Sequence, residues 1–163
     1  LVLPGVGAFG HAMGQLECRG LVEPIKERVE AGVPFLGVCL GLQLLFEQSQ
    51  ENPGVAGLGL LRGDVRLLPA GVKVPHIGWN EVRYVGNHPM IEKLPSRDVY
   101  YFVHSYRPEP MDAETIVGFA EYGGRFAAAV ARDNIFAVQF HPEKSQAAGK
   151  RLLDAYRQWL EAC

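Results

Sequence analysis

Val33-Pro34-Phe35-Leu36-Gly37-Val38-Cys39-Leu40-Gly41 is the stretch of sequence that decides the fold. Its first six residues form a short apolar run, which is typical of a buried strand in a parallel sheet. The segment 40–50 that follows is predicted as a helix, with Leu44, Leu45 and Phe46 as its apolar residues. A strand, a turn and a helix in this order indicate an α/β fold.

The residues before this stretch predict a strand end, a loop and two helices. Residues 1–3 read as the end of a buried strand, and residues 4–10 form a glycine-rich loop. Helices are predicted over 11–18 and 21–31, the second because its apolar residues recur at i, i+4 and i+8. Because the chain lacks an initiator Met and opens inside a strand, we expect an N-terminal strand–helix segment to be missing.

The middle of the chain is rich in predicted strands. They cover residues 65–68, 80–85, 99–106, 115–121, 126–132 and 135–140. Gly123-Gly124 and Asp133-Asn134 predict hairpin turns between the last three of these strands. A closing helix is predicted from Ser145, its N-cap, with an apolar face made by Leu152, Leu153, Tyr156, Trp159 and Leu160. We expect one α/β domain over residues 1–163, with a mostly parallel sheet flanked by helices and an antiparallel excursion.

The composition excludes several classes of protein. The chain has 163 residues, of which 48% are hydrophobic and 21% charged, as in a globular protein. A formal net charge of −2 offers no basic surplus for nucleic acid, and no apolar run is long enough to span a membrane. Three cysteines favour a reduced cytoplasmic protein over a disulfide framework. No Cys/His cluster has the spacing of a zinc site, so we predict no metal and no cofactor.

The turn after the apolar strand has the pattern of a nucleophile elbow. Gly37-Val38-Cys39-Leu40-Gly41 reads G-x-C-x-G, the cysteine version of a strand–nucleophile–helix turn. Such a turn lifts the Cys39 sulfur to a helix N-terminus, where the helix dipole favours a thiolate. The Leu40 N–H would point at an oxyanion formed after attack. The alternative is that Cys39 is a small buried core residue.

A base with an orienting acid stands at another strand end. His141 closes the apolar run 135–140, and Glu143 follows two residues later, on the same side of an extended chain. Pro142 restrains the backbone of both. Glu143 can therefore hold the imidazole in one tautomer while the other ring nitrogen faces the cysteine. The alternative is an ordinary surface turn.

These motifs together resemble the class I (triad) glutamine amidotransferases. The resemblance rests on Pro4-Gly5-Val6-Gly7, on the elbow extended to Gln43, and on His141-Pro142-Glu143, in the order that the family has. It implies a flavodoxin-like α/β fold and hydrolysis of L-glutamine to glutamate and ammonia through a thioester. Cys39 would be the nucleophile, His141 the base, and Glu143 its orienter.

The resemblance also implies an oxyanion hole and a substrate pocket. Leu40 N–H would be one oxyanion donor, and Val6 or Gly7 N–H the second, formed only when a partner's ligand binds. Gln43 and Glu47, at i, i+4 on one helix face, would bind the amino-acid end of glutamine, unless that face is simply solvated. Ser105 and Tyr106 resemble the segment whose backbone holds the substrate carboxylate.

A closer resemblance, to the glutaminase subunits of imidazole glycerol phosphate synthase, predicts a protein partner. Pro75-His76-Ile77-Gly78-Trp79-Asn80 and the segment 101–106 carry it. It implies a heterodimer in which Trp79 and Asn80 dock on a (β/α)8 cyclase subunit and ammonia passes between the subunits. Trp79 as a core aromatic is the alternative. Three functions compete: a glutaminase of another pathway (anthranilate or pyridoxal phosphate), a stand-alone γ-glutamyl hydrolase, and a non-catalytic regulatory subunit.

Overall fold

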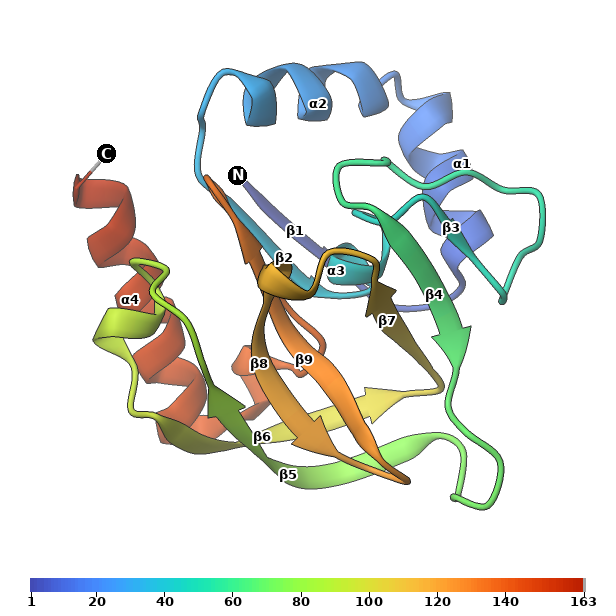
Figure 1. Ribbon diagram of the computed structural model, residues 1–163. Helices are drawn as coiled ribbons and strands as arrows, with labels where there is room; N and C mark the ends of the chain where they lie inside the picture. Colours follow the sequence, from blue (N-terminus) through green and yellow to red (C-terminus); the bar gives the residue numbers. More distant parts are fainter. Residues whose placement is uncertain (163) are drawn as a thin grey trace.

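A mixed seven-stranded sheet forms the centre of the protein, seen in a computed structural model that describes residues 1–162 (Figure 1). In spatial order its strands are β1 (Val2–Gly5), β2 (Phe35–Cys39), β10 (Ile135–Val138), β9 (Arg125–Arg132), β8 (Ile116–Glu121), β5 (His76–Tyr84) and β6 (Arg97–His104). The β1–β2 and β2–β10 pairs are parallel, and every later pair in the order is antiparallel. The α/β class is therefore confirmed, but the sheet is mixed and not mostly parallel as predicted, because strands of the predicted β-rich middle join the central sheet as antiparallel neighbours.

A second, smaller sheet and the helices complete the fold. The small sheet has the order β3 (Gln48–Ser49), β4 (Gly63–Leu67), β7 (Tyr106–Pro110). The α-helices are α1 (Phe9–Cys18), α2 (Val22–Glu30), α3 (Leu40–Gln43) and α4 (Gln146–Ala162). Short 3₁₀ turns lie at η1 (Ile91–Lys93), η2 (Ala113–Thr115) and η3 (Pro142–Lys144). Within residues 1–162, no helix is both long and apolar enough to cross a lipid bilayer.

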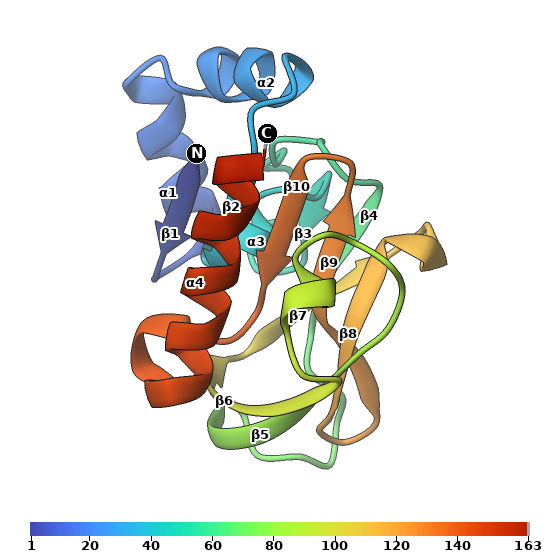
Figure 2. The ribbon, with the colours of Figure 1, turned by 90° about the vertical axis from the view of Figure 1, so that its left-hand side faces the viewer.

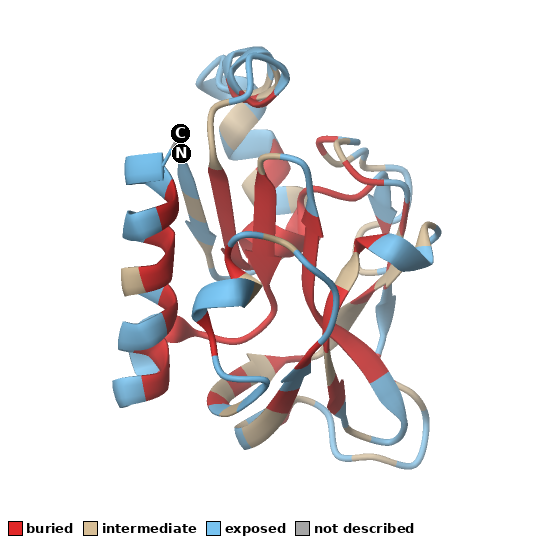
Figure 3. Ribbon diagram, turned by 60° about the vertical axis from the view of Figure 1, so that its left-hand side comes forward, coloured by how far each residue is buried: buried red, intermediate tan, exposed pale blue. Residues whose placement is uncertain are grey.

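Helices cover both faces of the parallel strands, which is why β2 and β10 are buried throughout. The α4 helix runs along one face (Figure 2), and its inner side is buried while its outer side is exposed (Figure 3). Side chains of β10 alternate between two cores: Phe136 packs in the core that contains α4, and Ala137 in the core that contains α1 and α2. This two-sided burial explains the continuous apolar run seen in the sequence.

The predicted helix over 40–50 is wrong beyond its first turn. The α3 helix ends at Gln43 because the following carbonyls bond to a distant segment instead of continuing the helix. The N–H groups of Leu58 and Leu61 donate to the carbonyls of Leu44 and Leu45, at 2.8 and 2.9 Å. Leu44, Leu45 and Phe46 are core residues, as their apolar character indicated, but not on a helix.

Other boundaries differ by smaller amounts. Residues 1–3 belong to a strand, but β1 lies at the edge of the sheet and its Val2 side chain is exposed, not buried. The predicted strand 99–106 is two strands, β6 and β7, which separate at Ser105. Both predicted hairpin turns are confirmed. Leu153 and Leu160 of α4 are exposed, so the apolar face of that helix is narrower than predicted.

Candidate active site

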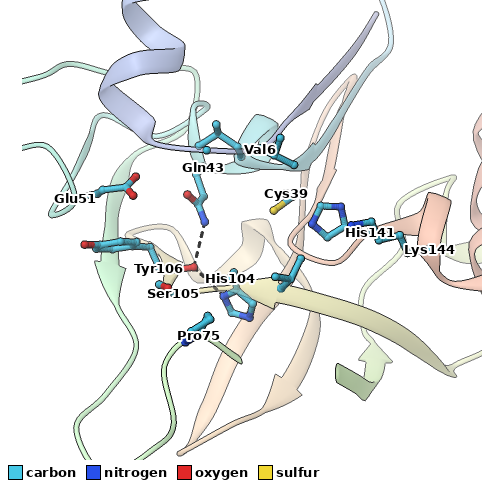
Figure 4. Close-up of a pocket in the computed structure, with 13 residues that line it drawn as sticks. Val6, Cys39, Gln43, Glu51, Pro75, His104, Ser105, Tyr106, His141 and Lys144 are labelled. Atoms are coloured by element: carbon cyan, nitrogen blue, oxygen red, sulfur yellow. Dashed lines mark hydrogen bonds between the residues drawn. The ribbon is translucent and has the colours of Figure 1, made fainter. Parts of the chain in front are cut away.

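A cavity of about 430 Å³ opens beyond the carboxyl ends of β2 and β10, where ligands usually bind in open α/β sheets (Figure 4). Eight predicted site residues line it: Val6, Gly7, Cys39, Leu40, Gln43, Ser105, Tyr106 and His141. Five unpredicted residues complete the lining: Glu51, Pro75, Val103, His104 and Lys144. The volume suits a small molecule such as an amino acid.

Cys39 sits on a strained turn, as a nucleophile elbow requires. Its backbone has φ 53° and ψ −107°, a conformation that a residue with a side chain adopts only when the surroundings enforce it. The flanking glycines allow this turn to pack. A Cβ on Gly41 would overlap the Leu3 carbonyl of β1, and one on Gly37 would lie 2.9 Å from the Cβ of Ala137. The elbow is therefore built into the sheet by contacts on two sides.

The Cys39 thiol is neutral in this arrangement. Its pKa is raised to about 11, mainly by burial and to a smaller extent by the negative charge of Glu143. A hydrogen bond from the Leu40 N–H, one from Gln139 and the charge of Lys144 act in the opposite direction. The expected thiolate at the helix N-terminus is thus outweighed by burial, so the thiol needs a base before it can attack.

His141 is placed to be that base. Its Nδ1 lies 2.7 Å from Oε1 of Glu143, and its ring is only 2% exposed. The other ring nitrogen, Nε2, is buried and has no hydrogen-bond partner among the described residues. Figure 4 shows the imidazole beside the Cys39 sulfur on the same wall of the cavity. A Glu143 acceptor on Nδ1 keeps the proton there and leaves Nε2 as the proton acceptor.

Ser145 fixes the backbone of the base. Its hydroxyl donates to the His141 carbonyl at 2.6 Å and accepts the Tyr101 N–H at 2.9 Å. The side chain predicted as a helix N-cap therefore bonds back to His141, while the Ser145 carbonyl accepts the Gly149 N–H of α4. Ser145 therefore connects the start of α4 to His141, which follows the end of β10.

A directed chain of amide groups runs from β7 to the thiol. Gln43 Nε2 donates to the Tyr106 carbonyl and to Oε1 of Gln139, each at 3.1 Å. Gln139 Nε2 in turn lies 3.7 Å from Cys39 Sγ. A backbone carbonyl can only accept, so the Gln43 atom near Tyr106 must be the nitrogen. Both of its hydrogens are then used, and Oε1 of Gln43 remains as the acceptor for a ligand.

Glu47 is not in the cavity, which corrects the prediction for that residue. Its carboxylate accepts the Gly63 N–H at 2.8 Å and so anchors the end of β4. The helical spacing that paired it with Gln43 does not exist, because α3 ends at Gln43. Glu51 supplies a carboxylate to the cavity instead, and its Oε2 accepts the Phe9 N–H of α1 at 2.7 Å.

Trp79 and Asn80 lie on opposite faces of β5. Trp79 is 49% exposed and meets Tyr101 edge-on at 5.9 Å between ring centres, which excludes the core-aromatic alternative. Asn80 faces inward, where its amide donates to the Glu121 carbonyl at 2.9 Å. The Asn80 amide is therefore engaged within its own chain, and its expected role in docking stays a prediction.

Sequence reasoning missed Gln139, Glu51, His104 and Lys144. The signal for Gln139 was present, since it precedes His141 by two residues and alternation places both on one side. Glu51 gave no local signal, because its position depends on the early end of α3. Cys18 is exposed and does not line the cavity, and Cys163 lies outside the described residues. No group of three His, Cys, Asp or Glu side chains within residues 1–162 is arranged to hold a metal ion.

Comparison with known proteins agrees with this geometry. The family model "Glutamine amidotransferase class-I" matches residues 1–156. Imidazole glycerol phosphate synthase subunit HisH of Aquifex aeolicus is 51% identical over 161 residues, covering 99% of this chain and 78% of that protein. The HisH subunit of Moorella thermoacetica is 52% identical over 153 residues, covering 94% and 73% respectively.

Solved structures give the same fold at low sequence identity. A crystal structure of a glutamine amidotransferase superposes with a TM-score of 0.74 at 20% identity, covering all of this chain and 79% of the other. PurLQS from Thermotoga maritima has the same TM-score at 19% identity, covering 98% and 79%. The family model and the identity to the HisH proteins together show that the chain belongs to the class I glutamine amidotransferase family and, within it, to the HisH subunits of imidazole glycerol phosphate synthase.

Proposed function

We propose that this protein, as a single glutamine amidotransferase domain, hydrolyses L-glutamine and delivers the ammonia to a cyclase subunit that forms imidazole glycerol phosphate. The observation that carries the proposal is the buried Cys39 beside His141, whose Nδ1 is held by Glu143, in a chain about half identical to HisH subunits. The place in histidine biosynthesis is supported by the similarity to HisH subunits. A cytoplasmic location is also part of the proposal, and the free thiols of Cys18 and Cys39 support it.

The reaction begins with proton transfer. His141 Nε2 takes the proton of the Cys39 thiol, and the sulfur attacks the side-chain amide carbon of glutamine. The C=O electron pair moves onto oxygen, and the tetrahedral intermediate then expels ammonia, which receives its proton from the His141 imidazolium. Water attacks the resulting thioester with His141 again as base, which releases glutamate and restores the thiol. Glu143 stabilises the imidazolium in both steps.

Backbone N–H groups stabilise the oxyanion in this proposal. The Leu40 N–H is close enough to Cys39 to lower the pKa of its thiol, so it lies beside the reacting atom. Val6 and Gly7 also line the cavity, and Val6 lies beside Cys39 in Figure 4. Gly7 has a φ of +97° and no side chain, so the peptide between these two residues can adopt alternative orientations. The second donor comes from this loop and is completed when the cyclase subunit binds its nucleotide. One such donor contributes roughly 2.7–4 kcal/mol to transition-state stabilisation.

The polar groups of the cavity favour an α-amino acid. Gln43 Oε1 and the Glu51 carboxylate are acceptors, which suits the α-ammonium group of glutamine. Ser105, which connects β6 to β7, and Tyr106, the first residue of β7, also line the cavity and offer backbone groups for the α-carboxylate, which is on the same carbon as the α-ammonium group. The substrate amide then lies toward Cys39, on the wall opposite Glu51 in Figure 4.

The exposed face of the β5–β6 hairpin is the proposed docking surface for the cyclase subunit. Ile77, Trp79 and Val99 are apolar side chains exposed there, and Trp79 is the type of residue that dominates interface energetics. A sealed interface has a chemical purpose, because ammonia that reaches water is protonated and no longer nucleophilic. The (β/α)8 form of the partner is carried over from the family resemblance.

Covalent labelling tests the chemistry at the site. Incubation with 6-diazo-5-oxo-L-norleucine, a glutamine analogue with an electrophilic carbon, should attach one equivalent to the peptide that contains Cys39. Cys39→Ala should abolish labelling, whereas Cys18→Ala should not, because Cys18 is exposed on α1 outside the cavity. Labelling that persists in Cys39→Ala, or that occurs at Cys18, refutes the mechanism and leaves a non-catalytic subunit as the favoured function.

A further inference from the structure

We propose that His104, held in one tautomer by His76, is a positioning residue of the glutaminase site, because it fixes the carbonyl group that orients Gln43 toward the substrate. This inference rests on the proposed function. Neither histidine belongs to the triad, and their contact links β5, whose outer face carries Trp79, to the wall of the cavity.

The two histidines form a buried pair across β5 and β6. They are register partners in the antiparallel ladder, and their side chains are 4% and 5% exposed. Nδ1 of His76 lies 2.9 Å from Nε2 of His104. Nδ1 of His104 lies 2.8 Å from the Tyr106 carbonyl oxygen, the same atom that accepts Gln43 Nε2–H. The pair is therefore continuous with the chain that ends at the thiol.

The positions of the protons on the two rings follow from the backbone carbonyls of Tyr106 and Glu121, which lie at the two ends of this hydrogen-bonded chain. The Tyr106 oxygen can only accept, so His104 Nδ1 carries a hydrogen, and neutral His104 must accept at Nε2. His76 Nδ1 is therefore the donor to it, and His76 Nε2 is the acceptor. The Asn80 amide nitrogen is 3.5 Å from His76 Nε2 and is fixed as a nitrogen by its bond to the Glu121 carbonyl.

The surroundings keep both rings neutral, as this proton arrangement requires. His76 is stacked between Tyr122, at 3.9 Å, and Phe102, at 5.0 Å between ring centres. No carboxylate forms an ion pair with either histidine among the described residues. Burial lowers the pKa of His104 to about 4, and the neighbouring His76, His141 and Arg107 act in the same direction. Burial also lowers the pKa of His76.

The tautomer of His104 matters because the Tyr106 carbonyl oxygen determines the orientation of the Gln43 side-chain amide. With His104 donating, that oxygen accepts two hydrogen bonds, and Gln43 presents Oε1 to the cavity. With the opposite tautomer, the lone pair of His104 Nδ1 would face the lone pairs of the carbonyl oxygen and repel it. The carbonyl would turn, and the Gln43 amide would lose the bond that sets its orientation. Binding of the glutamine α-ammonium group would weaken as a result.

Two amide substitutions of His104 separate the roles of its ring nitrogens. In His104→Asn, the side-chain amide can donate from the position of Nδ1, so the bond to Tyr106 is retained. In His104→Gln, the amide reaches the position of Nε2 and the bond to Tyr106 is lost. With saturating cyclase subunit, we expect the glutamine KM of His104→Gln to exceed that of His104→Asn by about fivefold to tenfold, the effect of one hydrogen bond. The kcat values of the two variants should differ less than their KM values.

A merely structural role for His104 predicts a different result, since either amide leaves a similar defect in packing. Equal KM values, or a difference confined to kcat, would overturn the proposal. His11→Gln, at an exposed position of α1, serves as the control for substitution of a histidine outside this chain. An unsubstituted protein that neither hydrolyses glutamine nor reacts with 6-diazo-5-oxo-L-norleucine refutes the proposed function instead.

Nitrogen NMR of the unsubstituted protein tests the tautomer without any mutation. Spectra of ¹⁵N-histidine-labelled protein at pH 7 should show His104 protonated at Nδ1 and bare at Nε2. His76→Gln removes the donor to His104 and should allow the opposite tautomer to appear. A His104 that is protonated at Nε2 in the unsubstituted protein contradicts the inference, whatever the enzyme kinetics of the variants.

Discussion

Cys39 combines a strained backbone with a thiol whose pKa burial raises to about 11. At neutral pH the thiolate fraction of such a group is very small, so attack depends on proton transfer to His141 Nε2. The unpaired Nε2 atom is costly to bury, and its function as a proton acceptor explains why it remains without a partner. The residue-scale arrangement therefore favours a site that is inactive until substrate and partner complete it.

The pH dependence of alkylation tests this resting state. In a Cys18→Ser, Cys163→Ser variant, Cys39 is the only thiol, and its reaction with iodoacetamide reports the thiolate fraction. Because the pKa is raised, the rate should be low at pH 7 and should rise through pH 9 to 11. A rate that is already at its plateau below pH 8 would contradict a neutral resting thiol, since that result requires a resting thiolate–imidazolium pair. Unfolded protein supplies the reference rate for a free thiol.

The triad could be predicted from the sequence because each member lies next to a local signal. Cys39 lies between two glycines after an apolar strand, and Glu143 lies two residues after His141. The substrate-binding residues were harder to predict from the sequence. Glu47 was assigned by helical spacing and is wrong, and Glu51 enters the cavity only because the chain leaves the helix after Gln43.

At the scale of elements, the elbow depends on close packing between α3 and β1. Gly41→Ala should destabilise the protein by about 1–3 kcal/mol or more, because its Cβ would overlap the Leu3 backbone. Urea unfolding measures the change. Gly14→Ala is the matched control within α1, where a Cβ meets nothing within 4 Å, and it should be neutral or stabilising by about 1 kcal/mol. Equal effects of the two substitutions would refute the packing argument.

The strands were more predictable than the helix after the elbow. Two-sided burial gives β2 and β10 an apolar run that the sequence displays directly, and glycine or Asp-Asn turns mark the hairpins. The end of α3 is set by hydrogen bonds to residues 57–61, which local propensity does not report. The main error in the predicted elements therefore arises because N–H groups of residues 57–61 bind the carbonyls that a longer α3 helix would use.

At the scale of the whole molecule, the exposed face of β5 and β6 is the expected contact with the cyclase subunit. Trp79→Ala should weaken that association by about 2 kcal/mol, a factor of about 30 in Kd, if Trp79 is an interface hot spot. Calorimetric titration measures the affinity. Leu153→Ala, which removes a similarly exposed apolar side chain from the outer face of α4, should leave the affinity within about twofold. Equal affinities for both variants would place the interface elsewhere.

The most direct measurement is the glutaminase rate of this protein alone, with the cyclase subunit, and with the cyclase subunit plus its ribonucleotide ligand. We predict a low rate for the isolated protein and strong stimulation by the liganded cyclase, abolished by Cys39→Ala. A rate that is unaffected by the cyclase would refute the proposed function, since it would make this protein a glutaminase of another pathway or a stand-alone hydrolase.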